Sequence, residues 1–122
     1  MLDRQNVEKS QIIQYIMNEE EILRITPKSP FIVHFNKLVK DSNFIYFIME
    51  FIEGEDLFDV ITKVLTFTPD NTRFLVSQIL LMMEHMHGSR IIYRDLKPEN
   101  LMMNLNGYLT LVDMGTAKRL KI

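Results

Sequence analysis

The alternation of apolar and polar residues in the first part of the chain predicts an amphipathic helix. Over residues 6–25, apolar side chains recur at spacings of three and four, so they fall on one face of a helix. Glu19 lies in the middle of that stripe, where a carboxylate needs a cationic partner, backbone amides or water to offset its burial. Pro27 and Pro30 then predict the end of the helix. The stripe comprises Ile12, Tyr15, Ile16, Glu19, Ile22 and Leu23.

Two strand-like runs follow this helix and predict a β-hairpin. They cover residues 32–40 and 44–50, and the Asp-Ser-Asn sequence at residues 41–43 supplies turn chemistry between them. Residues 51–55, which include a glycine, then read as a connector between two subdomains.

Two further helices are predicted after the connector. Residues 56–63 predict a short helix. Thr68 followed by Pro69 is typical of a helix start, with threonine as the N-cap and proline at the first helical position. That second helix is expected to run to Gly88, a residue that commonly marks a helix end.

A second hairpin is predicted near the end of the chain. Its strands cover residues 101–103 and 108–112, and Asn106-Gly107 between them is a strong signal for a tight turn. A hairpin folds the segment that follows it back beside the segment that precedes it.

Composition narrows the class of protein without deciding its function. The chain has 122 residues, 47% hydrophobic and 25% charged, as expected for one small globular domain. The net charge of −2 gives no case for nucleic-acid binding, and the absence of cysteine excludes disulfides and thiolate metal sites. No apolar run approaches the ~20 residues of a membrane span. Without a signal-peptide stretch, a cytoplasmic protein is expected.

The segment that precedes the second hairpin carries the chemistry, and it reads YRDLKPEN over residues 93–100. This order resembles the catalytic loop of protein kinases. By that resemblance Asp95 takes the proton of the acceptor hydroxyl, Lys97 neutralises charge on the phosphoryl group, and Asn100 gives an oxygen to Mg²⁺. The alternative interpretation of the segment is a solvated charged turn.

The segment that follows the second hairpin carries the other acidic residue of interest. Asp113-Met114-Gly115 stands where kinases place a magnesium-binding aspartate. An aspartate after a strand can also be a cap or a turn residue, so the hairpin that joins it to Asp95 is what favours the metal role. Glu19 matches the kinase glutamate that pairs the ATP-binding lysine.

The resemblance to eukaryotic serine/threonine protein kinases covers nearly the whole chain. The sequences at residues 29–33, 93–95 and 113–118 are similar to the group that contains the cyclic-nucleotide-dependent kinases, and most of all to cGMP-dependent kinases. The resemblance implies an α+β, bilobal kinase fold. Residues 1–50 would form part of the N-lobe, and residues 51–122 the hinge and the start of the C-lobe.

The same resemblance implies the ligands and their contacts. ATP and Mg²⁺ would be cofactors, and the substrate would be a protein with serine or threonine near basic residues. Leu23, Phe35, Tyr93 and Met114 would form a stacked apolar column between the lobes. Backbone groups of the hinge residues Glu50, Phe51 and Ile52, which follow the gatekeeper Met49, would hold adenine, and Met102 would pack under it. Asp56 would lie near the ribose or a basic residue of the substrate. Glu99 would contact a basic residue of the substrate.

Several parts of a kinase domain are not found in this sequence. There is no Gly-x-Gly-x-x-Gly loop, no lysine-bearing strand before the first helix and no activation segment. We therefore expect an internal fragment of a catalytic domain that is inactive alone. The alternatives are a non-catalytic, pseudokinase-type binding or scaffold piece, and a truncated gene product without function.

Overall fold

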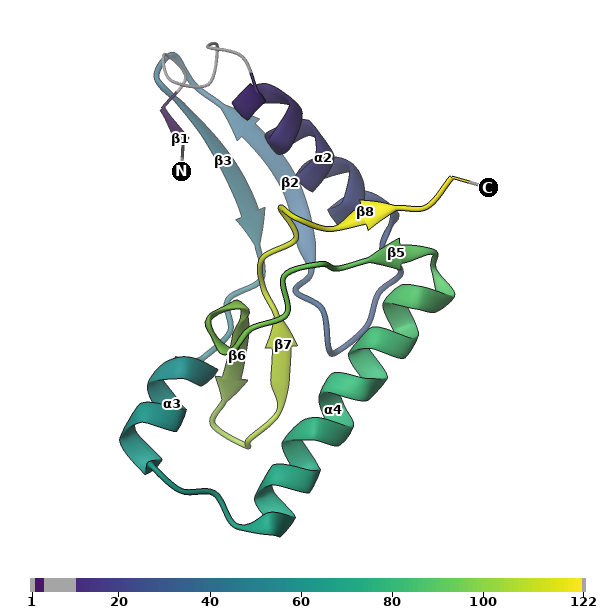
Figure 1. Ribbon diagram of the computed structural model, residues 1–122. Coiled ribbons are helices and arrows are strands. Elements are labelled where there is room, and N and C mark those ends of the chain that lie inside the picture. Colours follow the sequence, from purple (N-terminus) through teal and green to yellow (C-terminus); the bar gives the residue numbers. More distant parts are fainter. Residues whose placement is uncertain (1, 4–10, 122) are drawn as a thin grey trace.

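The computed structural model describes residues 2–3 and 11–121, with side chains described for residues 12–121. Its first helix, α2 (Gln11–Ile25), lies beside a three-stranded antiparallel sheet (Figure 1). In that sheet β3 (Phe44–Met49) lies between β1 (Leu2–Asp3) and β2 (Phe35–Lys40). The predicted helix is thus confirmed from residue 11, and residues 6–10 lie outside the described residues.

The first hairpin forms as predicted, but its first strand is shorter than residues 32–40. β2 and β3 pair with Leu38 opposite Phe47, and Asp41 accepts hydrogen bonds from the backbone amides of Asn43 and Phe44 in the turn. Residues 31–33 pair instead with a later strand, because Val33 donates to the Leu111 carbonyl at 2.9 Å and Leu111 donates to the Phe31 carbonyl at 2.8 Å.

The second half of the chain contains two helices beside small sheets. α3 (Leu57–Val64) begins at an N-cap, Asp56, whose carboxylate accepts from the Asp59 amide. α4 (Pro69–Gly88) begins with Thr68 as N-cap and Pro69 in its first turn, as predicted. The helix ends at Gly88, also as predicted.

The second hairpin belongs to a sheet with the strand order β4-β6-β7. β4 (Gly54–Asp56) pairs antiparallel with β6 (Leu101–Asn104), which pairs with β7 (Leu109–Leu111). Gly107 in the turn has φ 83°, a left-handed value that favours glycine. A two-stranded ribbon, β5 (Ile91–Ile92) with β8 (Lys118–Arg119), and a 3₁₀ turn, η1 (Pro98–Asn100), complete the elements.

One glycine position shows how closely two of these strands approach. A Cβ at Gly54 would lie under 3.0 Å from the Met103 carbonyl and the Asn104 Cα. The backbone of β4 therefore touches β6 where a side chain cannot fit, and this contact fixes the connector against the second hairpin.

One hydrophobic cluster joins the two halves of the described chain. It includes the four residues of the predicted column, which are 0–9% exposed: Leu23, Phe35, Tyr93 and Met114. The expected inward stripe of α2 is confirmed at Ile16, Ile22 and Leu23 but wrong at Ile12 and Tyr15, which are 44% and 47% exposed. α2 contacts β2 and β8, and Ile16 packs with Ile45 from the sheet, so only part of the helix face meets the core. No helix in the described part of the chain has the length and apolarity to cross a membrane.

Candidate functional site

The loop at residues 93–100 connects the ribbon strand β5 to the second hairpin, and it is tied to the segment at residues 113–117. Arg94 has φ 72°, a left-handed value that is uncommon for residues other than glycine. Its Nε donates to the Thr116 carbonyl at 2.7 Å, and the Thr116 hydroxyl donates to the Tyr93 carbonyl at 3.3 Å. Two hydrogen bonds thus hold the two loops together.

Asp95 and Asn100 are joined within this loop. The Asn100 Nδ2 donates to the Asp95 carbonyl at 3.0 Å and to Asp95 Oδ2 at 3.1 Å, and Asn100 is buried. The Lys97 Nζ lies 3.2 Å from the same Oδ2. Asp95 Oδ1 has no hydrogen-bond partner among the described residues, so it is free to accept a proton, or a hydrogen bond that a hydroxyl group donates.

Asp113 follows the second hairpin and is attached to the same loop through the backbone. Val112 donates its amide to the Asn100 carbonyl at 3.1 Å, and Asp113 Oδ1 accepts from the Gly115 amide at 2.9 Å. The hydrogen bond from the Gly115 amide gives Asp113 the turn role that the sequence allowed as an alternative to metal binding. Asp113 Oδ2 has no partner in the described residues, so the turn role leaves one oxygen for a ligand.

The two aspartates converge on one buried phenol. Burial raises the pKa of Tyr93 most, and the Asp113 carboxylate and then the Asp95 carboxylate raise this pKa further. The Tyr93 hydroxyl makes no hydrogen bond of good geometry in the described chain, although the adjacent Asn100 side chain lowers its pKa. The charges of Asp95 and Asp113 and the Asn100 side chain therefore all act on the Tyr93 hydroxyl.

The donor set of this site fits a hard divalent cation. Mg²⁺ prefers oxygen ligands and is commonly held by one or two carboxylates with waters and phosphates. The amide nitrogen of Asn100 is engaged by Asp95, which leaves its oxygen for a metal, and Asp113 has a free carboxylate oxygen. Within the described residues no group of three His, Cys, Asp or Glu side chains forms a metal site. The predicted set needs only two side chains and does not depend on such a group.

Glu19 of α2 faces the segment at residues 113–117. Burial raises its pKa most and the Asp113 carboxylate raises it further, while a hydrogen bond from the Met114 backbone amide lowers it. Among the described side chains no lysine or arginine forms an ion pair with Glu19. The effect of the Met114 amide favours the backbone-amide interpretation, and pairing with a lysine stays a prediction.

The raised pKa of Glu19 predicts how stability depends on pH. Because the folded chain holds the proton more tightly than the unfolded chain, stability should fall as pH rises from the ordinary glutamate value, 4.5, through the raised value. Glu19→Gln removes this loss and keeps an oxygen for the Met114 amide. We expect the variant to melt at a higher temperature than wild type at pH 7, with the difference shrinking toward pH 4.

Thermal melts at several pH values would test this expectation. Glu21 on the exposed side of the same helix provides the matched control, since Glu21→Gln should leave the pH dependence unchanged. A constant difference between Glu19→Gln and wild type across the pH range would contradict the role given to the Glu19 charge.

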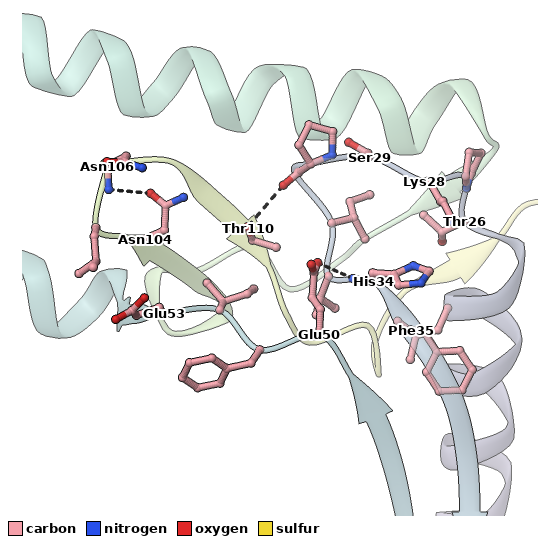
Figure 2. A pocket seen from close by; sticks show the side chains of 18 residues that line it. Thr26, Lys28, Ser29, His34, Phe35, Glu50, Glu53, Asn104, Asn106 and Thr110 are labelled. Carbon is pink, nitrogen blue, oxygen red and sulfur yellow. Dashed lines mark hydrogen bonds between the residues drawn. The ribbon is translucent and has the colours of Figure 1, made fainter.

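The predicted hinge, Glu50, Phe51 and Ile52, borders a cavity of about 680 Å³. Figure 2 shows this cavity between the hinge, the loop after α2 and the β6–β7 turn. Glu50 is fixed there by His34, because its amide donates to the His34 carbonyl at 2.9 Å and its Oε1 accepts from the His34 amide at 2.7 Å. None of Asp95, Asn100 and Asp113 lines the cavity. The cavity therefore lies apart from the loop at residues 93–100.

The remaining residues predicted for ligand binding occupy varied environments. Phe51 is 88% exposed, and the backbone groups of Phe51 and Ile52 make no hydrogen bonds with the described residues. Asp56 uses one carboxylate oxygen to cap α3, a role that the sequence did not indicate.

Met49 ends β3 and is 36% exposed, and Met102 in β6 is half-buried. Glu99 is exposed and forms no ion pair with a described residue.

Two polar residues that position the site were not identified as such from the sequence. Gln78 on α4 is 4% exposed, and its amide spans the second hairpin by accepting from Leu109 at 2.8 Å and donating to the Gly107 carbonyl at 3.2 Å. Asn18 on α2 donates to the Ala117 carbonyl at 2.9 Å. A lone amide within the apolar face of α4 was the available signal for Gln78. The sequence offers no comparable signal for Asn18.

Comparison with known proteins agrees with this geometry. The family model "protein kinase domain" matches residues 1–122. A catalytic-subunit-like cAMP-dependent protein kinase of Caenorhabditis elegans is 41% identical over 108 residues, 88% of this chain and 27% of the relative. A cGMP-dependent protein kinase, isozyme 2, of Drosophila melanogaster is 39% identical over 120 residues, 94% of this chain and 13% of the relative. The cGMP-dependent protein kinase of Plasmodium berghei is 38% identical over 91 residues.

The chain spans about a quarter or less of the length of these relatives. The match to the family covers residues 1–122, and it includes the loop at residues 93–100 and the Asp-Met-Gly sequence at residues 113–115. The α+β arrangement of one helix and a hairpin, followed by two helices and a second hairpin, agrees with the predicted fold class. The chain therefore belongs to the protein kinase domain family.

Proposed function

We propose that the protein transfers the γ-phosphoryl group of ATP to serine or threonine hydroxyls of other proteins. The observation that best supports this is the hydrogen bonding that ties Asp95 to Asn100, and Asn100 to the backbone of Val112 beside Asp113. Asp95, Asn100 and Asp113 each retain a side-chain oxygen without a partner in the described chain. Phosphoryl transfer depends mainly on positioning the reactants and on stabilising charge. These three oxygens would position the acceptor hydroxyl and the metal ion that stabilises the phosphate charge.

Each residue has a separate role in the proposed reaction. Asp95 Oδ1 accepts the proton of the attacking hydroxyl and orients that hydroxyl toward the phosphoryl group. Lys97, already 3.2 Å from Asp95 Oδ2, offsets negative charge on the transferred group. Asn100 and Asp113 would hold Mg²⁺ through their oxygens, and the bound ion would neutralise phosphate charge.

The adenine and the substrate contacts extend the proposal beyond this centre. The unpaired backbone groups of Phe51 and Ile52 suit the hydrogen-bonding edge of adenine, next to Met49 and Met102. The exposed carboxylate of Glu99 suits a basic residue of the substrate. Relatives named as cAMP- and cGMP-dependent kinases support membership of the cyclic-nucleotide-dependent group. Within that group, the sequences at residues 93–95 and 113–118 favour the cGMP-dependent type.

Phosphorylation of matched peptides would test the proposed function. The full-length protein would be incubated with labelled ATP, Mg²⁺ and a basic peptide that carries serine, threonine, tyrosine or alanine at the acceptor position. We expect label on the serine and threonine peptides and none on the alanine peptide. Transfer to tyrosine alone would contradict the substrate class. No transfer to any peptide would favour a binding role.

A further inference from the structure

Three side chains on one face of α2 contact the segment at residues 113–117. Asn18 donates to the Ala117 carbonyl at 2.9 Å, and the Glu19 carboxylate is near enough to the Met114 amide for that amide to lower its pKa. Tyr15, three and four positions earlier, lies on the same face and reaches Gly115. The segment that carries Asp113 is thus held by one turn of α2.

The side chain of Tyr15 lies directly against the backbone of Gly115. A Cβ at Gly115 would lie under 3.0 Å from Tyr15 Oη, Cζ and Cε1. Among the described glycines only Gly107 has a positive φ, so the backbone at Gly115 would accept other residues. Glycine at position 115 therefore provides room for the Tyr15 ring.

The environment of the Tyr15 hydroxyl places it beside the proposed metal ligand. Burial raises the pKa of Tyr15, and the carboxylates of Asp113, Glu19 and Asp95 raise it further in that order. The phenol is therefore a neutral group among three carboxylates at neutral pH. Its ring is nevertheless 47% exposed, so little of the hydrophobic core depends on it.

We infer that Tyr15 is a positioning residue for Asp113, because its ring lies against Gly115 and closes the Asp-Met-Gly turn onto α2. The inference rests on the proposed function in one respect, namely that Asp113 binds Mg²⁺. Asp113 Oδ1 accepts from the Gly115 amide, so a displaced Gly115 would release the carboxylate from its present orientation. A residue that supports a ligand in this way commonly affects metal affinity by about 10-fold or more.

The test uses Tyr15→Ala, Gly115→Ala and the double variant in the full-length protein. Gly115→Ala should expel the Tyr15 ring, so both single variants lose the same contact. Each should raise the Mg²⁺ concentration needed for half-maximal nucleotide binding by about 10-fold. The double variant should be no weaker than either single variant, because the contact can be lost only once.

Two further variants separate positioning from general damage. Met17→Ala is the matched control, since Met17 is 57% exposed on the same helix. Tyr15→Phe keeps the ring and should restore most of the Mg²⁺ affinity lost in Tyr15→Ala. Effects that multiply in the double variant, or a Tyr15→Ala variant that behaves like Met17→Ala, would overturn the inference.

Amide hydrogen exchange without nucleotide gives a readout that does not depend on kinase activity. The amides of Met114 and Gly115 should exchange faster in Tyr15→Ala than in wild type. Unchanged exchange would refute the contact itself. Faster exchange with unaltered Mg²⁺ dependence would refute the positioning role. If exchange is faster but wild type binds no nucleotide, the proposed function fails while the contact stands.

Discussion

Replacing Asp95 with alanine should abolish phosphoryl transfer while leaving ATP binding nearly unchanged. The free Oδ1 of Asp95 is the proposed proton acceptor, and a general base contributes roughly 10²- to 10⁴-fold to the rate. Nucleotide binding should persist because the Asn100 Nδ2 retains its 3.0 Å hydrogen bond to the backbone carbonyl of residue 95. The change should therefore appear in kcat and not in the affinity for MgATP.

Single-turnover transfer to a basic serine peptide, in the full-length protein, measures this effect directly. Asp70→Ala is the matched control, because Asp70 is an exposed aspartate whose only described ion pair is with Arg73 on α4. Its rate should equal that of wild type. Turnover by Asp95→Ala close to the wild-type rate would remove Asp95 from the role of base.

Replacing Asp113 should remove the dependence of nucleotide binding on Mg²⁺. The proposed metal-binding oxygen of Asp113 is the free Oδ2, and a hard cation between phosphates requires such a charged oxygen. We expect the Mg²⁺ enhancement of ATP affinity to fall by at least ~10-fold, the smaller effect known for residues that only support a metal ligand.

Asp113→Asn separates the metal role from the turn role. Asparagine keeps an oxygen for the Gly115 amide at the position where Asp113 Oδ1 accepts at 2.9 Å, but it lacks the charge. Both Asp113→Asn and Asp113→Ala should lose the Mg²⁺ enhancement in an ATP titration, while only alanine loosens the turn. An asparagine variant that retains the full enhancement would show that Asp113 is structural.

Local chemistry explains which parts of the fold were predictable. Thr68 and Pro69 determine a helix start by their own side chains, so their prediction is confirmed. Gly107 takes the left-handed backbone that its turn requires. The first strand was predicted too long because Ile32 forms a bridge with Leu111, almost 80 positions later, which no local pattern encodes.

In the site, too, the local sequence indicated some residues, while contacts between residues distant in the sequence could not be predicted from it. The order of residues 93–100 indicated Asp95, Lys97 and Asn100, and the hairpin indicated that Asp113 would return beside them. Periodicity placed Tyr15 on an apolar stripe, although its environment is set by Gly115, one hundred positions away. Likewise, the hydrogen bonds that fix Glu50 come from the backbone of His34. Contacts of this kind depend on the tertiary fold.

Asp95, Asn100 and Asp113 are proposed to form one site for a nucleotide-bound divalent cation. Paramagnetic broadening by Mn²⁺ with ATP, read on the backbone amides of the isotope-labelled full-length protein, tests it most directly. We expect the strongest broadening at Asn100 and Asp113, with Asp95 close behind, and we expect excess Mg²⁺ to remove this broadening. Broadening centred instead on the cavity beside Glu50 and Asn106, with Asn100 and Asp113 unaffected, would contradict the claim.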